Sequence, residues 1–204
     1  MKEISQSSTK KGIEFLKKKD KDFIPLLDKI DGRLSVFSIH DGFPGIIKLI
    51  TEQQLSVASA KAIHNRVLSL VSPMTPEKVI STKKDLLKET GLSWQKVNYC
   101  LGISKACVDK KIDLNSFNKK TDEEILDELT KLKGIGEWTA NCYLLGGLKR
   151  IDVFPSSDLV LQLAIKKMKC LKEKPNKSST EEIASSWEPF RSIAALILWS
   201  SYEK

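Results

Sequence analysis

The residues of this chain best suited to chemistry are a Gly-x-Gly pair and an aspartate that follows it, Asp158. Gly134 and Gly136 follow Leu132 and precede a helical pattern. Glycine permits positive φ and the close approach of another backbone. The first amides of a helix lack intrahelical acceptors, so residues 136–138 are expected to point their N–H groups at an anion. The pattern therefore predicts an anion-binding hairpin and, at Asp158, an acid available for a reaction.

The charge of the chain indicates what kind of anion to expect. Its 204 residues include 34 Lys and Arg against 26 Asp and Glu, which gives a net charge of +8. This balance suits a polyanion such as nucleic acid, although a basic protein without such a partner would show it too. Lysines are dense between residues 10 and 21, where they form either a solvated helix face or a DNA contact.

Four segments carry a resemblance to a known family. Residues 132–140 resemble the helix-hairpin-helix of DNA base-excision glycosylases, and residues 152–159 resemble their Gly/Pro-rich loop with its terminal aspartate. The Gln-Gln turn in residues 50–57 and the Trp-x-Pro-x-Arg-Ser…Trp pattern in residues 187–199 are similar to the 3-methyladenine DNA glycosylase II branch, which removes alkylated bases. The resemblance covers residues from about 42 to 202.

Helical periodicity recurs along the chain and strand signals are almost absent, so we expect an all-α fold. Helices are expected on both sides of a break near Asp20, before and after a break at 52–54, and at 77–80, 93–110, 121–132, 138–145, 159–168, 181–185 and 189–202. Thr75 and Thr121 are expected to cap helices, the second in a capping box. Residues 115–120 and 172–179 are expected to be polar connectors.

The resemblance implies two helical lobes with a cleft between them. Lobe A is expected at about 1–40 together with 150–204, and lobe B at about 41–149, with the hairpin at 132–138. Larger relatives carry an additional N-terminal β-sheet domain. This chain starts too late to include one, so we expect a single compact helical domain.

The position of Asp158 in the sequence supports two interpretations of its role. It precedes an apolar helical pattern, where an acid is favoured by the helix dipole while Ser156 or Ser157 caps the helix. The resemblance instead makes Asp158 the one essential carboxylate of the family. Breaking an N-glycosidic bond builds positive charge on the deoxyribose, which a fixed carboxylate stabilises. The same group can orient or deprotonate the attacking water.

Trp138 occupies the position at which bifunctional relatives carry a lysine nucleophile. Such a lysine forms a Schiff base and cleaves the DNA backbone, which tryptophan cannot do. Lys133 is a poor substitute because it precedes the hairpin. The resemblance therefore implies a monofunctional glycosylase without lyase activity.

The resemblance also implies a base pocket. Trp138 and Trp199 match its aromatic positions, where an indole face attracts a cationic base, although tryptophans are also common in cores. Cys142 and Leu159 stand near positions at which some relatives have aromatic residues. We therefore expect a pocket that is either roomier or less aromatic, which leaves the range of substrates open.

A base must leave the duplex before it can be excised. Gln54 matches the residue that fills the resulting gap, with Gln53, Leu55 and Ser56 beside it. The alternative is that these polar residues cap helices at a kink. Arg191 is expected to pair with an acid rather than to touch DNA.

No cofactor is expected. Four cysteines form no close pair, the first two falling within a helical pattern and the last two in apolar surroundings, and we expect reduced thiols at Cys100, Cys107, Cys142 and Cys170. Iron–sulfur relatives place four cysteines near the C-terminus, and the segment after Cys170 has none. His40 and His64 lack supporting ligands. Backbone carbonyls near Leu132 and Ile135 are expected to suit a structural Na⁺ or K⁺.

The sequence thus predicts a monofunctional glycosylase that releases alkylated purines of the 3-methyladenine and 7-methylguanine type from double-stranded DNA. Alternatives are a non-catalytic module that binds damaged DNA and a glycosylase for other lesions. Asp158 argues against the module, because a pure binder gains nothing from an acid facing phosphodiesters. We expect a monomer in the cytoplasm, or in the nucleus of a eukaryote, since neither a membrane span nor a signal peptide is evident.

Overall fold

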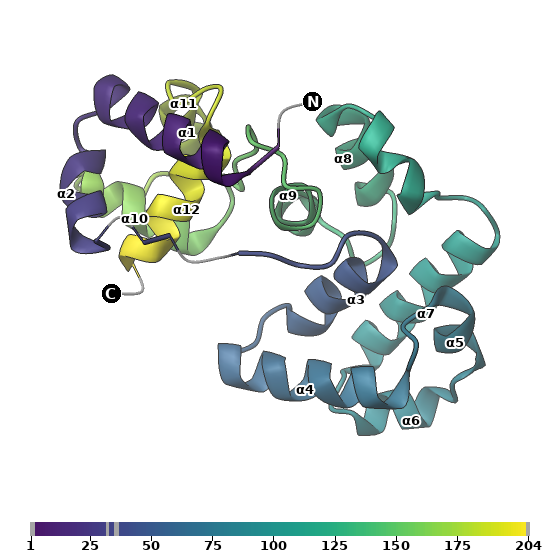
Figure 1. The fold of residues 1–204 in the computed structure, drawn as a ribbon. Helices are drawn as coiled ribbons and strands as arrows, with labels where there is room; N and C mark the ends of the chain where they lie inside the picture. Colours follow the sequence, from purple (N-terminus) through teal and green to yellow (C-terminus); the bar gives the residue numbers. More distant parts are fainter. Residues whose placement is uncertain (1–2, 32, 35–36, 203–204) are drawn as a thin grey trace. The chain divides into compact units, whose positions relative to one another are not determined.

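A computed structural model describes residues 3–31, 33–34 and 37–202. Over these residues the chain is helical, and the β structure within them is one isolated antiparallel bridge between Glu3 and Arg150 (Figure 1). The predicted all-α fold is confirmed.

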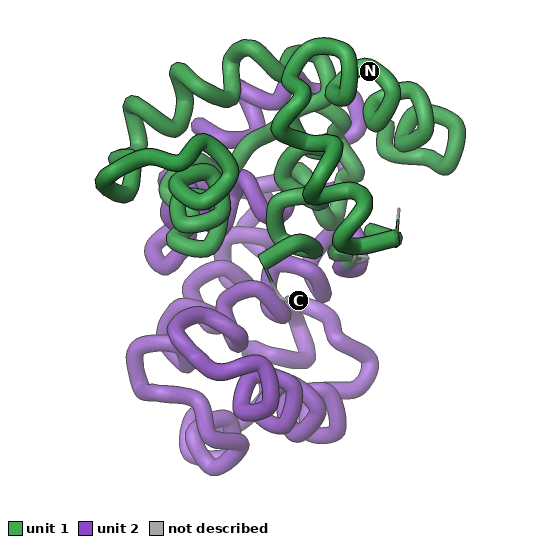
Figure 2. Tube along the Cα trace, turned by 90° about the vertical axis from the view of Figure 1, so that its left-hand side faces the viewer, with its two compact units in different colours: residues 1–38, 144–204 green, residues 39–143 purple. Residues whose placement is uncertain are grey.

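The chain divides into two compact units (Figure 2). Unit 1 comprises Met1–Ser38 and Leu144–Lys204, and unit 2 comprises Ile39–Tyr143. The sequence placed these borders at 40/41 and 149/150. The second border instead falls inside helix α9, Glu137–Gly146. Residues 137–143 of this helix belong to unit 2 and residues 144–146 to unit 1.

Unit 1 is built around the helix nearest the C-terminus. Its other helices are α1 (Gln6–Lys19), α2 (Phe23–Lys29), α10 (Leu159–Met168) and α11 (Lys177–Ser185), and the central helix is α12 (Arg191–Tyr202). α12 packs against α1, α2 and α10. Leu16, Phe23, Ile165, Trp187 and Ile197 are fully buried there, and each such side chain contributes about 1.5–3 kcal/mol by leaving water.

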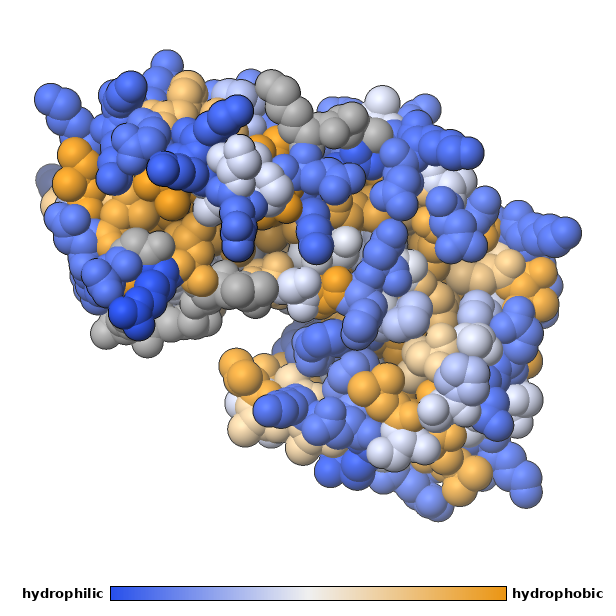
Figure 3. Space-filling view, viewed as in Figure 1, coloured by the Kyte–Doolittle hydropathy of each residue, from blue (hydrophilic) through white to orange (hydrophobic). Residues whose placement is uncertain are grey.

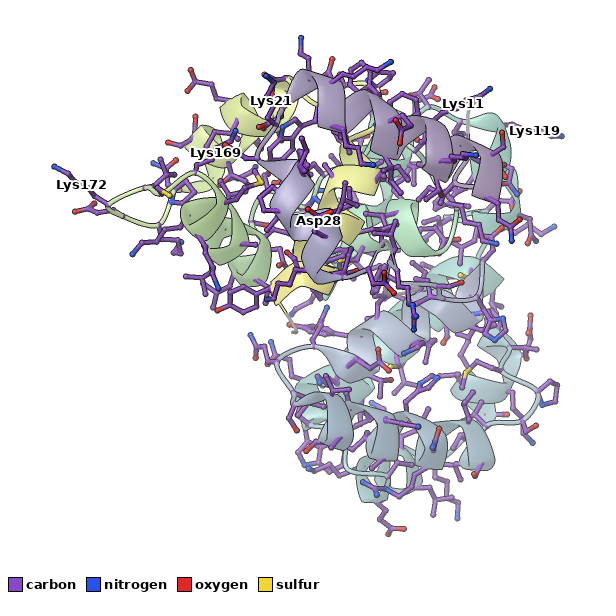
Figure 4. The ribbon with its side chains drawn as sticks, turned by 60° about the vertical axis from the view of Figure 1, so that its left-hand side comes forward. Lys11, Lys21, Asp28, Lys119, Lys169 and Lys172 are labelled. Atoms are coloured by element: carbon purple, nitrogen blue, oxygen red, sulfur yellow. The ribbon has the colours of Figure 1, made fainter. Side chains whose placement is uncertain are left out.

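Ion pairs and an indole hydrogen bond join the ends of these helices. Lys169, just after α10, donates to both carboxylate oxygens of Asp20 at 2.7 Å and to Asp22 at 2.9 Å. The Trp187 Nε1–H donates to Asp20 Oδ2 at 2.9 Å. Figure 4 labels Lys169 together with Lys172, which projects from the loop that follows. Asp20 therefore links the α1–α2 turn to two distant parts of unit 1.

Unit 2 contains the helices between residues 39 and 143. They are α3 (Phe43–Glu52), α4 (Val57–Leu70), α5 (Pro76–Ser81), α6 (Lys84–Glu89), α7 (Trp94–Val108), the 3-10 helix η1 (Leu114–Lys119), α8 (Asp122–Thr130) and the first part of α9. α7 packs against α3, α5 and α6, and α3 packs against α4. Side chains of Ser56, Thr75, Ser93 and Thr121 cap helices α4, α5, α7 and α8. The caps predicted at Thr75 and Thr121 are confirmed, including the Thr121–Glu124 capping box.

Three expectations about the elements are wrong. Residues 115–120 are largely the 3-10 helix η1, which the Asp113 side chain caps and which buries Leu114 and Phe117. Residues 172–179 are not all connector, because α11 begins at Lys177 with Asn176 as its cap. Cys170 is exposed rather than placed among apolar side chains.

Candidate functional site

The Gly-x-Gly turn joins α8 to α9 in unit 2, as the sequence predicts. Gly134 has φ +100°, and a Cβ added to it would lie 2.3 Å from Cγ of Tyr99. Only glycine fits this position. Gly136 is exposed, and a Cβ there would meet nothing within 4 Å. Its carbonyl accepts the Ala140 N–H at 3.0 Å, so Gly136 opens α9.

The Gln-Gln turn contacts this hairpin. Gln53 Nε2 donates to the Gly134 carbonyl and to Thr139 Oγ1, both at 3.0 Å. The Gln53 side chain is therefore hydrogen-bonded within unit 2, and its predicted place beside a gap-filling Gln54 stays a prediction. The Ser56 side chain caps α4, because its Oγ accepts the Ser59 N–H. Gln54 and Leu55 remain exposed, Gln54 with φ +55°.

Lys96 on α7 supports the same turn from another direction. Its Nζ donates to the carbonyls of Thr51 at 2.8 Å and Gln53 at 2.6 Å, at the C-terminal end of α3. An ammonium group is favourable there because the last carbonyls of a helix carry partial negative charge. Burial lowers the pKa of Lys96 below its ordinary 10.5. This contact could not be predicted from the sequence, because Lys96 is more than 40 residues from the turn along the chain.

A groove of about 480 Å³ lies in unit 2 over these elements. It is formed by the Gln-Gln turn, the hairpin and the first turns of α7. Its lining residues are Gln53, Gln54, Ser93, Gln95, Lys96, Tyr99, Thr130, Leu132, Lys133, Gly134, Ile135 and Gly136. Most of its lining is polar, which suits an anionic or hydrogen-bonding ligand better than an apolar one.

Asp158 lies in unit 1 and is itself the N-cap of α10. Its Oδ1 accepts the Leu161 N–H at 2.9 Å and the Trp199 Nε1–H at 3.1 Å. The expectation that Ser156 or Ser157 would cap this helix is wrong. Ser156 is buried and donates to Glu181 Oε1 at 2.9 Å. Two donors from different helices therefore fix the carboxylate of Asp158.

Trp199 contacts Asp158 through its edge and is half-buried. Its ring centroid lies 5.2 Å from that of Phe37 at an interplanar angle of 50°. Leu159, the residue after the aspartate, is 58% exposed. The arrangement explains why an indole serves at this position: it combines an aromatic face with an N–H donor.

The loop that leads to Asp158 is held by residues of the Trp-x-Pro-x-Arg-Ser segment. Arg191 donates to Asp152 Oδ1 at 2.9 Å and pairs with Glu188 at 2.9 Å, which confirms that it pairs with acids. Ser192 Oγ accepts the Val153 N–H at 2.9 Å and donates to the Arg150 carbonyl at 2.7 Å. No role is predicted for Ser192 from the sequence, although its place directly after Arg191 in the motif is a usable signal.

The remaining pocket residues belong to unit 2. Trp138 is half-buried on the first turn of α9, and Cys142, one turn later, is 1% exposed. Cys142 is thus packed in the interior of the protein and adds no open space beside it. Elsewhere in unit 2, burial raises the pKa of Cys100 to about 12 and that of Cys107 to about 11, which makes both thiols poor nucleophiles.

Metal ligands do not gather among the described residues, where no group of three or more His, Cys, Asp or Glu side chains could hold an ion. The Leu132 carbonyl accepts the Ile135 N–H at 3.0 Å, and a carbonyl oxygen has a second lone pair for a cation. The Na⁺ or K⁺ near Leu132 and Ile135 stays a prediction. None of the helices in the described part of the chain has the length and apolar character to span a membrane.

Comparison with known proteins bears on this arrangement. The model of the HhH-GPD superfamily base excision DNA repair proteins matches residues 47–189, which include the Gln-Gln turn, the hairpin and Asp158. The chain belongs to this superfamily. HhH-GPD relatives include the alkylbase DNA glycosidase-like protein mag2 of Schizosaccharomyces pombe, 32% identical over 165 residues, with 78% of each chain covered.

A second HhH-GPD relative is the putative DNA-3-methyladenine glycosylase YfjP of Bacillus subtilis. It is 30% identical over 186 residues, 83% of this chain and 65% of that protein. The solved structure of 3-methyladenine DNA glycosylase Mag1 from Schizosaccharomyces pombe in complex with abasic DNA superposes with a TM-score of 0.85 at 28% identity, covering 93% of this chain and 95% of that one. Within the superfamily, the similarity is to the 3-methyladenine DNA glycosylase branch.

Proposed function

We propose that this protein is a base-excision repair glycosylase that hydrolyses the N-glycosidic bond of alkylated purines in double-stranded DNA, acting as a monomer. The observation that carries the proposal is the carboxylate of Asp158, fixed by the N–H groups of Leu161 and Trp199. Membership of the HhH-GPD superfamily and similarity to enzymes named 3-methyladenine glycosylases support it.

The reaction follows from the position of this carboxylate. As the bond to the base stretches, positive charge grows on the deoxyribose, and a preorganised anion stabilises it without having to move. Asp158 also directs the attacking water and accepts its proton. An alkylated purine already carries positive charge and departs without strong acid catalysis, so one acid suffices. The face of Trp199 is proposed to receive the flipped base, and Trp138 stays a predicted pocket residue.

We propose further that the enzyme is monofunctional. Trp138 stands where bifunctional relatives carry a lysine, and its indole cannot form a Schiff base. Lys133 precedes the hairpin and is exposed. The abasic DNA produced by base release is then expected to keep an intact backbone.

The test compares wild type with Asp158→Asn on duplex DNA methylated with an alkylating agent. Asparagine is as good an N-cap as aspartate, so α10 and DNA binding should persist while the negative charge is lost. We expect release of free methylated base to fall by about 10²-fold or more, the size typical for losing one preorganised electrostatic contact.

Two readouts separate the alternatives. Free base is quantified by chromatography, and strand integrity is checked on a denaturing gel without heat or alkali. Strand cleavage by wild type would contradict the monofunctional proposal. Binding to alkylated DNA with no base release from it would favour the binding module, and release of a different base would favour another lesion specificity.

A further inference from the structure

The Gln-Gln turn and the hairpin are joined by side-chain hydrogen bonds that the proposed reaction does not by itself require. Gln53 reaches across to Gly134 and Thr139, and Lys96 holds the carbonyls of Thr51 and Gln53. All five residues belong to unit 2. We call the Gln53 and Lys96 side chains, with these four contacts, the brace.

The backbone conformation beside the brace is strained. Gln54 has φ +55°, a left-handed conformation that residues other than glycine seldom adopt. Such conformations persist only where the surroundings enforce them. The contacts to Gln53, immediately before Gln54, supply that enforcement. Gln54 itself is exposed, with its side chain available to a ligand.

The groove shows why such enforcement is useful. Gln54, the hairpin residues 134–136, Gln53 and Lys96 all line it, and Gln53 is hydrogen-bonded directly to the hairpin at Gly134. A strand gripped by the hairpin would thus lie at a fixed offset from Gln54. The side chain that fills a gap in the duplex must meet the duplex at a set position along the strand, and a turn that moved independently of the hairpin would lose that register.

We propose that Gln53 and Lys96 are positioning residues for base flipping, which hold Gln54 in its gap-filling conformation at a fixed place relative to the hairpin. This inference rests on the proposed function. Lys96 lines a polar groove, but we assign it a role other than phosphate binding. Two of the three N–H donors of its ammonium group are hydrogen-bonded to carbonyls at the end of α3. The brace contributes only where a gap exists, so it should matter for damaged duplex and little for intact duplex.

The experiment measures affinity for two duplexes of one sequence, one intact and one with a tetrahydrofuran abasic site. Because no bond is broken, the assay does not depend on catalysis. We expect Gln53→Ala to lower the preference for the abasic duplex about tenfold, equivalent to about 1.4 kcal/mol, with less than about twofold change on intact duplex. Gln54→Ala should give the same selective loss. Gln6→Ala, an exposed glutamine of unit 1, is the matched control and should change neither affinity.

The double variant decides whether the brace acts through Gln54. If Gln53 only positions Gln54, then Gln53→Ala combined with Gln54→Ala should be no worse than Gln54→Ala alone. Additive losses, or equal losses on intact and abasic duplex, would overturn the proposal. Thermal unfolding shows whether each variant is folded. If Gln53→Ala does not fold, Lys96→Met, which keeps the aliphatic part of the side chain, replaces it in the double-mutant cycle with Gln54→Ala.

The proposed function can fail separately from the brace. Wild type that prefers the abasic duplex, with no loss in Gln53→Ala or Lys96→Met, overturns the brace alone. Wild type that does not distinguish the two duplexes also overturns the brace. The proposed function is overturned by its own test, when wild type releases no methylated base.

Discussion

At the scale of single residues, Trp199 combines two separate roles, one for its ring face and one for its N–H group. Its face is proposed to receive a base, while its Nε1–H fixes the carboxylate at 3.1 Å. A phenylalanine could offer a ring face to a base but could not donate a hydrogen bond to Asp158. This distinction matters because the sequence motif alone predicts an aromatic wall, and the structure adds an orienting donor.

Replacing Trp199 by phenylalanine separates these duties. The ring and its contact with Phe37 should survive, whereas Asp158 Oδ1 loses a donor and with it part of its orientation. A neutral hydrogen bond to a charged group is worth about 1.5–3 kcal/mol, so kcat for base release should fall by about tenfold or more while KM changes little.

The control is Trp94→Phe, at an exposed tryptophan on α7. It should leave both kinetic constants unchanged. A rise in KM at constant kcat for Trp199→Phe would mean that the indole serves substrate binding and not the orientation of Asp158.

At the scale of elements, the sequence predicted best where a helix has both a periodic stripe and a cap. α7 and α8 were expected within one or two residues of their observed bounds, because Ser93 and Thr121 mark their starts. α6, with six residues, and η1 were missed, since an element of fewer than two turns does not repeat its apolar pattern.

The site follows the same division. The resemblance to family motifs predicts Asp158, Trp199 and the hairpin as site residues, because such motifs consist of residue types at short spacings along the chain. They could not show that Gln53 turns inward or that Cys142 is buried. The direction of a side chain is set by neighbours from distant segments, such as the Gly134 carbonyl 81 residues from Gln53.

The α1–α2 turn depends on Asp20, which makes its contribution sensitive to pH. Burial alone would raise the pKa of Asp20, but the hydrogen bonds from Lys169 and Trp187 outweigh it and hold the pKa below the ordinary 3.8. A lowered carboxyl pKa means that the stabilisation is present above pH 3.8 and is lost as the pH falls through the folded value.

Asp20→Asn should therefore lower the free energy of unfolding by about 2 kcal/mol at pH 6, the range for a hydrogen bond to a charged group. The difference from wild type should shrink as the pH falls below 3.8. Urea unfolding of both proteins between pH 3 and pH 6 measures it. A difference that stays constant over this range would show that the Asp20 charge contributes nothing.

At the scale of the whole molecule, charge is the dominant feature. Most of the net +8 belongs to unit 1. In Figure 3, hydrophilic side chains cover much of the visible face, with smaller apolar areas between them. Lys11, Lys21 and Lys172, labelled in Figure 4, are all exposed. Such a surface favours a polyanion irrespective of its base sequence.

Binding to undamaged duplex should accordingly weaken with salt. Each phosphate contact releases counterions, and two contacts already give about a tenfold loss between 50 and 200 mM salt. We expect at least that loss, measured by fluorescence anisotropy, with the same slope for Asp158→Asn, because this substitution removes no Lys or Arg contact to a phosphate. Affinity that does not change with salt would contradict an electrostatic contribution.

The division of unit 1 into two chain segments also has a consequence for synthesis on the ribosome. Its core joins residues far apart in sequence: Asp20 bonds Trp187, and Lys29 Nζ donates to the Ser201 carbonyl. Unit 2 is translated whole before either late partner emerges. Leu16 and Phe23 therefore lack their apolar partners from the second segment while unit 2, which lies between the two segments of unit 1, folds. Contacts between residues far apart in sequence also form slowly. The nascent chain is consequently most vulnerable to aggregation and chaperone capture just before α12 leaves the exit tunnel.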